Sequence, residues 1–149
     1  MENKTINQID TWISNLNNEE KKKELREFFG IIPLNKIEDY IEECTKSKSK
    51  SAKKDREGFI FQDLVNELGK RLDYDVKFGV YKGKKKAKKT EKINGYDGLW
   101  TKGEDCLIVV ESKVSDIFLN LDTVNEYKED LVKEGNISAN NTSILIVLG

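Results

Sequence analysis

The chain has 149 residues, with 26 basic and 27 acidic side chains, a net charge of −1, and no histidine. This length suits a single domain of ~100–200 residues. The absence of histidine excludes Ser-His-Asp and Cys-His catalysis, zinc sites that contain histidine, and nucleases that use histidine as the general base. Any hydrolysis by this chain must therefore use carboxylates, lysine and a bound cation.

Two cysteines, Cys44 and Cys106, lie far apart and form no CxxC pair. This usage predicts buried thiols in a reducing cytoplasm, and neither a zinc site nor a secreted disulfide framework. No apolar stretch approaches the ~18 residues that span a bilayer, and the N-terminus lacks the apolar region of a signal peptide. We therefore expect a cytoplasmic protein without a membrane partner.

The first 45 residues have helical periodicity and predict a small helical subdomain. Asn18 is the expected N-cap of its second helix. The apolar positions of the three predicted helices are Ile6, Ile9, Ile13 and Leu16, then Leu25, Phe28 and Phe29, then Ile37, Tyr40, Ile41 and Cys44. The Lys/Ser-rich residues 46–56 are the predicted flexible linker, and residues 57–149 the predicted core domain.

After the linker the periodicity changes, and the pattern predicts an α/β fold. The expected elements are a helix over residues 55–70, strands over 74–80 and 93–101, a hairpin turn over 102–105, a strand over 107–113, a helix over 117–131 and a buried strand over 143–148. Their order is αβββαβ. It predicts one mixed central sheet with helices packed on it.

The candidate chemistry lies at the end of the most apolar strand. Strand alternation places Glu111 and Lys113 on one face and Ser112 on the other. Charged groups there cost several kcal/mol unless they are paired, solvated or bound to metal. The predicted hairpin brings Asp97, between Gly95 and Gly98, beside Glu111. Two carboxylates without histidine make an oxygen-only site that suits Mg²⁺ or Mn²⁺, where Lys113 can orient a metal-bound water.

A Glu-x-Lys triplet alone also fits a salt-bridged strand end. Together with Asp97, the apolar strand and the element order, it resembles the PD-(D/E)xK nuclease superfamily, which includes many restriction endonucleases. The resemblance covers residues 57–149: Asp97 matches the first acid, and Glu111-Ser112-Lys113 matches the (D/E)xK motif. It implies a restriction-endonuclease-like core in which the acids hold Mg²⁺, with the main-chain carbonyl of Ser112 as a further metal ligand.

Two positions depart from the family's pattern. Tyr96 stands where the motif has proline. On the first core helix, Gln62 stands where many members carry a glutamate that faces the site. Gln62 can still bind metal or water through its amide oxygen, but it brings no charge. Asp63 and Glu67 are substitutes of lower rank, because a solvated helix face is the favoured interpretation of both.

Two basic segments, residues 46–56 and 82–92, contrast with an otherwise acidic chain and favour a polyanionic partner. Solvated loops that lysine keeps soluble are the other interpretation of such runs. Beside a nuclease site, the second run is expected to contact the phosphate backbone of DNA without reading sequence. The residues expected to do so are Lys84, Lys85, Lys86, Lys88 and Lys89.

The sequence thus predicts a Mg²⁺-dependent endonuclease acting on double-stranded DNA, as the cleavage domain of a restriction or anti-phage system. Because the chain stops directly after a predicted strand, we expect further domains of the same polypeptide to follow. Two alternatives stay open: a catalytically inactive nucleic-acid-binding or assembly module with the same fold, and a junction resolvase that acts as a homodimer.

Overall fold

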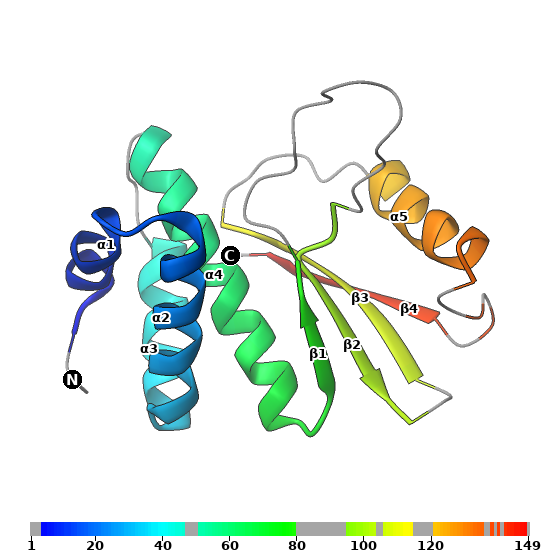
Figure 1. Cartoon of the computed structure of the whole chain (residues 1–149), viewed down its shortest axis with the longest axis horizontal. Helices are drawn as coiled ribbons and strands as arrows, with labels where there is room; N and C mark the ends of the chain where they lie inside the picture. The colour runs from blue at the N-terminus through cyan, green and yellow to red at the C-terminus, as the bar shows by residue number, and fades with distance from the viewer. Residues whose placement is uncertain are drawn as a thin grey trace. The chain divides into compact units, whose positions relative to one another are not determined.

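The computed structural model describes residues 4–46, 51–79, 95–103, 106–114, 121–135, 138, 140 and 142–148. The chain divides into two compact units, each described by itself below. The first comprises Met1–Leu68, Ser112–Asp116 and Leu148–Gly149, and the second comprises Gly69–Glu111 and Ile117–Val147. The elements in chain order are α1 (Ile6–Ser14), α2 (Asn18–Ile31), α3 (Leu34–Lys46), α4 (Ser51–Arg71), β1 (Asp75–Phe78), β2 (Gly98–Lys102), β3 (Cys106–Lys113), α5 (Leu121–Lys133) and β4 (Thr142–Leu148) (Figure 1).

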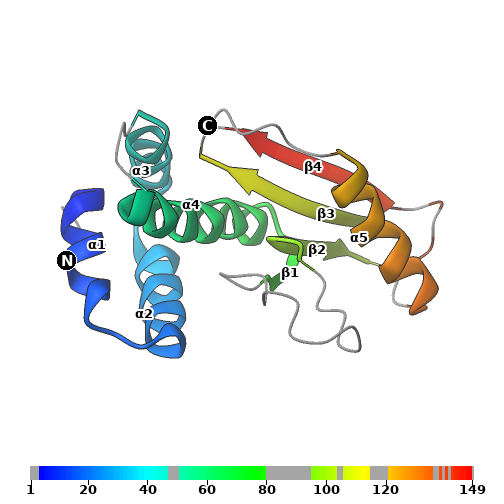
Figure 2. The ribbon, with the colours of Figure 1, turned by 90° about the horizontal axis from the view of Figure 1, so that it is seen from above.

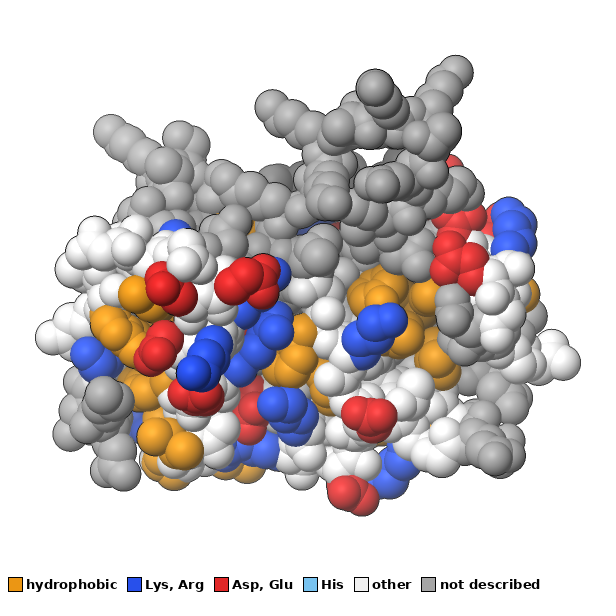
Figure 3. Space-filling model, in the orientation of Figure 1, with side chains coloured by type: hydrophobic (Ala, Val, Ile, Leu, Met, Phe, Trp, Pro, Cys, Tyr) orange, Lys and Arg blue, Asp and Glu red, His pale blue; other side chains and the backbone are white. Residues whose placement is uncertain are grey.

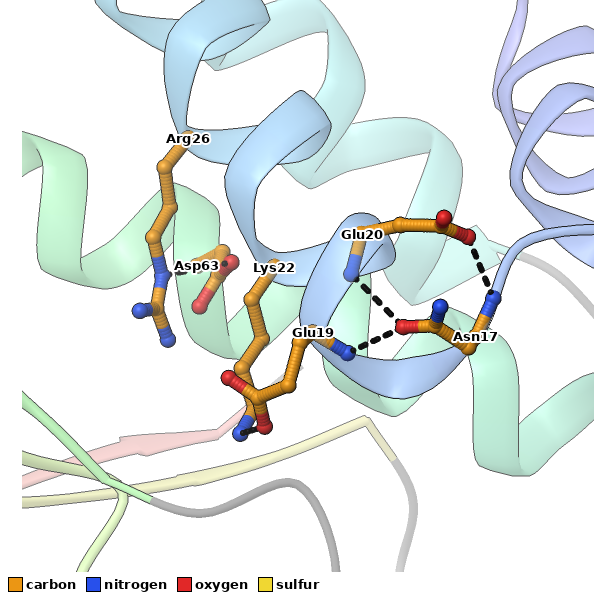
Figure 4. A network of polar contacts seen from close by, with 6 residues as sticks. All are labelled: Asn17, Glu19, Glu20, Lys22, Arg26 and Asp63. Atoms are coloured by element: carbon orange, nitrogen blue, oxygen red, sulfur yellow. Dashed lines mark hydrogen bonds and ion pairs between the residues drawn. The ribbon is translucent and has the colours of Figure 1, made fainter.

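The first two helices of the first unit begin at capping boxes. At α2, the side chain of Asn17 accepts hydrogen bonds from the backbone N–H groups of Glu19 and Glu20. The Glu20 carboxylate in turn accepts from the N–H of Asn17 at 3.0 Å (Figure 4). This reciprocal pairing satisfies N–H groups that a helix start leaves open. The cap is therefore Asn17, and the predicted Asn18 is wrong by one residue.

An aromatic cluster holds α1, α2 and α3 together. The Phe28 ring centroid lies 5.9 Å from that of Trp12 and 6.2 Å from that of Tyr40. The Tyr40 hydroxyl also donates to the Lys4 carbonyl at 2.6 Å, which ties the N-terminal segment to α3. The three predicted helices are thus present with a core of their own, and both Figures 1 and 2 show α2 and α3 beside α4.

Helix α4 is longer than the sequence pattern indicates. It begins at Ser51 and not near residue 55, so the second half of the predicted linker is helical. The reason is composition: alanine, lysine, arginine and glutamate are all good helix formers, even where no apolar face marks them. The two compact units also divide inside α4, after Leu68, and not at the predicted linker.

The second unit is built on a four-stranded mixed sheet in the order β1-β2-β3-β4. β2 is antiparallel to β1 and to β3, with Trp100 opposite Val76 and Leu99 opposite Val109. β4 runs in the same direction as β3, as the arrows in Figure 2 show. From α4 onward the elements follow the predicted order αβββαβ, which confirms an α/β fold. β2 begins at Gly98, later than the predicted residue 93.

Within this unit, residues of α5 and α4 pack against opposite faces of the sheet. On one face, Leu131 of α5 joins Tyr96, Leu99 and Val109 in a buried cluster. On the other, Gly69 of α4 lies so close to Trp100 that an added Cβ would sit 2.5 Å from the indole ring. Trp100 is therefore a core residue.

Strand β4 is less buried than the sequence predicts. The side chains of Ile144 to Val147 are only half-buried, and Ser143 is exposed. The physical reason is position: β4 lies at one end of the order of the described strands, and among these only β3 pairs with it. An apolar run of this kind suggests a fully covered strand, but it does not by itself separate an inner strand from an edge strand.

Both cysteines are free thiols. Cys44 is buried in the helical unit, as predicted, whereas Cys106 at the start of β3 is only half-buried. In the part of the chain that the structure describes, we find no helix with the length and apolar character needed to cross a membrane.

Candidate functional site

Asp97 lies at an irregularity in the sheet. Its backbone N–H donates to the carbonyl of Val110 at 2.9 Å, yet Val110 is already the partner of Gly98 in the β2–β3 register. On the other side, the Asp97 carbonyl accepts from the N–H of Gly79 at 2.9 Å. Two consecutive residues that oppose one residue of the neighbouring strand form a β-bulge. Asp97 is therefore attached by its backbone to the residue that precedes Glu111.

The bulge changes which residues face which side of the sheet. Strict alternation would place Tyr96 on the face of Gly98 and Trp100. Instead, Tyr96 is buried in the cluster with Leu99 and Val109, on the opposite face. The extra residue at Asp97 accounts for this reversal, because a bulge shifts the alternation by one position. Bulges re-aim side chains in this way, and they are common beside active sites.

Glycines permit the tight backbone around the bulge. A Cβ built on Gly79 would lie 2.0 Å from the carbonyl oxygen of Tyr96, a distance that no side chain tolerates. A Cβ on Gly95 would lie 2.7 Å from the Tyr127 hydroxyl of α5. Gly95 stands two residues before Asp97 in the predicted motif, whereas Gly79 was missed. The only sequence signal for Gly79 is its position directly after a predicted strand in which apolar and polar residues alternate.

Strand β3 carries the predicted Glu-x-Lys triplet at its end. Glu111 is 6% exposed, Ser112 is also buried, and Lys113 is half-buried. Alternation along β3 places Glu111 on the same face as Leu107 and Val109, which is the face that α5 packs against. The strand thus ends in a carboxylate that is removed from most solvent contact, an arrangement that is unfavourable unless the charge is compensated.

The carboxylate oxygens of Asp97 and Glu111 are the type of ligand that a hard divalent cation prefers. Asp97, Glu111 and the Ser112 carbonyl offer oxygen donors alone, and Mg²⁺ typically binds through one or two carboxylates, water and substrate phosphate. In the described ranges of the chain, no group of three or more acidic or cysteine side chains is placed to hold a metal.

Gln62 lies on α4 within a stretch that is buried on all sides, from Ile60 to Glu67. The side-chain amide of Asn66 donates to the Gln62 carbonyl at 3.0 Å. Gln62 belongs to the first unit, whereas Asp97 and Glu111 belong to the second. The contact of Gln62 with these two acids stays a prediction.

The solvated helix face expected for Asp63 and Glu67 is wrong, since both side chains are buried. Asp63 is fully buried and forms an ion pair with Arg26 of α2, with 3.3 Å between Nε and Oδ2 (Figure 4). The helix tolerates a buried carboxylate here because a guanidinium compensates its charge. Arg26 gave no sequence signal, because it stands in a run of charged residues that reads as a solvated face.

The lysines predicted to contact DNA, Lys84, Lys85, Lys86, Lys88 and Lys89, all lie outside the described residues. Their role stays a prediction. Compared with models of known protein families and with curated proteins, the sequence matches none.

Proposed function

We propose that this chain is a Mg²⁺-dependent endonuclease that hydrolyses phosphodiester bonds in double-stranded DNA, with a restriction-endonuclease-like core. The observation that carries the proposal is the bulge at Asp97, which bonds to Val110 beside the buried Glu111. The αβββαβ order and the mixed sheet support it. Together these features support the match of Asp97 and Glu111 to the two acids of the PD-(D/E)xK pattern.

The roles follow from the chemistry of the residues. Asp97, Glu111 and the Ser112 carbonyl would hold the Mg²⁺, and the bound ion supplies Lewis-acid stabilisation of phosphate charge. The Lys113 ammonium orients the attacking water and stabilises the negative charge that develops on the phosphate oxygens. Gln62 assists through its amide oxygen. The lysines of residues 82–92 hold the DNA backbone.

A plasmid cleavage assay tests the proposal. The wild-type protein is expected to nick or linearise plasmid in Mg²⁺ and to do nothing in EDTA. Asp97→Ala and Lys113→Ala should lose the activity. Glu129→Gln and Lys133→Ala, which remove an exposed ion pair of α5, are matched controls and should keep it. Full activity in Asp97→Ala, in Lys113→Ala or in EDTA contradicts the proposal.

One observation favours a second function, a catalytically inactive nucleic-acid-binding or assembly module. The helix position that usually carries an acid holds Gln62, and the neighbouring Asp63 is engaged by Arg26. Calorimetry with Mn²⁺ separates the two functions. A nuclease should bind Mn²⁺ and lose the binding in Asp97→Ala, whereas an inactive module should bind none.

The cellular setting belongs to the same proposal. The free thiols of Cys44 and Cys106 suit a cytoplasmic protein, and further domains of the polypeptide would supply sequence recognition. A junction resolvase would need a stable homodimer. Sedimentation together with cleavage of a four-way DNA junction tests that alternative, since a monomer without junction cleavage rules it out.

A further inference from the structure

The feature that carries a further inference is Tyr127 of α5, which packs against the segment that leads into the bulge. A Cβ built on Gly95 would lie 2.7 Å from the hydroxyl oxygen of Tyr127 and 3.0 Å from its Cζ atom. The tip of the tyrosine ring thus lies against the backbone of Gly95. Asp97, the first acid of the proposed metal site, follows two residues later.

Helix α5 presents Tyr127 to the sheet. Val124 and Leu131 are buried, and the helical period places both on the same side of α5 as Tyr127. The opposite side of the helix is charged: Glu129 and Lys133 form an exposed ion pair, and Figure 3 shows acidic and basic side chains where Figure 1 places α5. Tyr127 is therefore a polar residue within the stripe that faces the sheet.

The ring of Tyr127 covers the face of the sheet to which strand alternation assigns Glu111. It packs against the buried cluster that contains Tyr96 and Val109. Glu111 follows Val109 by two positions in β3, so the two side chains share this face. Tyr127 thus lies on the side of the second acid of the proposed site, while its tip contacts the segment before the first.

Backbone contacts hold the same segment from other elements. The N–H of Asp97 donates to the carbonyl of Val110 in β3, and its carbonyl accepts from the N–H of Gly79, which follows β1, both at 2.9 Å. These bonds fix Asp97 along the sheet, but a segment that lies between two glycines bends easily out of its plane. The Tyr127 ring limits this bending on the α5 side, because an aromatic side chain has few rotatable bonds and is rigid.

We propose that Tyr127 is a positioning residue that holds residues 95–97, and with them the Asp97 carboxylate, in the place that metal binding requires. Groups that bind a metal must be kept within ~0.5 Å of the productive geometry by neighbours that packing has locked. The inference rests on the proposed function, because Asp97 binds a metal only in that case. Tyr127 itself acts through the backbone and need not touch the metal or the DNA.

Amide hydrogen exchange followed by NMR tests the holding role without metal or DNA. Tyr127→Leu removes the ring and should raise the exchange rates of the Asp97 and Gly79 amides about tenfold, because their hydrogen bonds then open more often. Tyr127→Phe keeps the ring and should stay within about threefold of the wild-type rates. The matched control is Leu131→Val, which trims the same cluster one helical turn away and should change these rates by less than about twofold.

Calorimetry with Mn²⁺ then tests the positioning role. Tyr127→Leu should weaken Mn²⁺ binding about tenfold, the lower end of the usual cost of losing a residue that orients a metal ligand. Leu131→Val should bind Mn²⁺ as the wild-type protein does. Thermal melting of each variant checks that the fold is retained.

Wild-type exchange rates of both amides in Tyr127→Leu would overturn the inference, and so would wild-type Mn²⁺ affinity in that variant. Equal changes in Leu131→Val would also overturn it, because a general loosening of the cluster would then explain both effects. A wild-type protein that binds no Mn²⁺ contradicts the proposed function instead. In that case the exchange rates still decide whether Tyr127 holds the segment before Asp97.

Discussion

The guanidinium of Arg26 donates to the carboxylate of Asp63 at 3.3 Å and thereby links α2 to α4. The Asp63 side chain is 0% exposed, whereas that of Arg26 is 26% exposed. The charge of Asp63 is therefore removed from water, and the partly solvated guanidinium of Arg26 compensates it. This ion pair shows that α2 supports the part of α4 that carries Gln62.

The first prediction follows from this ion pair. Arg26→Met leaves a buried carboxylate without its cation and should reduce the free energy of unfolding by about 2–4 kcal/mol, slightly below the range for fully buried pairs because Arg26 is partly exposed. The double variant Arg26→Met/Asp63→Leu should recover most of the loss, since neither charge is then buried. Urea unfolding measures both, and a double variant as unstable as the sum of its single variants would contradict the interpretation.

A second prediction concerns the backbone at the bulge. Gly79→Ala forces a Cβ to within 2.0 Å of the Tyr96 carbonyl oxygen, so the strand must shift. We expect a loss of about 1–3 kcal/mol of stability, together with reduced activity, because the shift displaces Asp97. Gly30→Ala in α2 is the matched control, since no atom of the described residues lies within 4 Å of its added Cβ. Equal unfolding midpoints for the two variants would refute the prediction.

A third prediction concerns the packing of α4 on the sheet. Gly69→Ala places a methyl group 2.5 Å from the Trp100 ring and should lower stability by about 1–3 kcal/mol. Among the residues that the structure describes, the Cβ added by Gly58→Ala in the same helix meets only the Val114 side chain at 3.8 Å, an ordinary contact. It should instead raise stability by up to ~1 kcal/mol, because alanine is the better helix former. Thermal melting followed by circular dichroism shows whether each variant is less stable or more stable than the wild-type protein.

A fourth prediction concerns pH. Burial raises the pKa of Tyr40 above its ordinary value, and the nearby carboxylate of Glu43 adds to the effect. A raised folded pKa means that this contribution to stability is complete below the unfolded pKa of about 10 and is lost as the pH rises through the folded pKa. Tyr40→Phe should cost about 1 kcal/mol at neutral pH through the lost bond to the Lys4 carbonyl.

The same variant should flatten the decline in stability at alkaline pH. Urea unfolding of both proteins at several alkaline pH values measures this slope, and tyrosinate absorbance reports the titration directly. A Tyr40→Phe protein with the wild-type alkaline slope would show that another group governs it.

A fifth prediction tests the role of Lys113. If its ammonium stabilises charge in the transition state, Lys113→Met should lower kcat about 10²–10³-fold. The KM for DNA should change little, because an interaction that Lys113 makes mainly in the transition state adds little to the binding of DNA in the ground state. Lys133→Met, on the exposed side of α5, is the control and should keep kcat. A change confined to KM would assign Lys113 to DNA binding and not to the chemical step.

Much of the secondary structure was predictable because apolar periodicity is a local property. The spacing of Leu25, Phe28 and Phe29 predicted α2, and the run from Leu107 to Val110 predicted β3. The early start of α4 was not predictable in this way. Its first turns carry no apolar stripe, so their helical propensity was mistaken for the composition of a linker.

The sequence by itself determined the α/β class and the order of the elements, and its lack of histidine led to the prediction of a site with oxygen ligands alone. Only the tertiary structure decided the bulge at Asp97, the close approach of Gly79 to Tyr96, the Arg26–Asp63 ion pair and the contact of Tyr127 with Gly95. These features join residues that are distant in the chain or interrupt a regular period. Periodicity reports which side of one element is apolar, whereas packing decides which polar group meets which partner across elements.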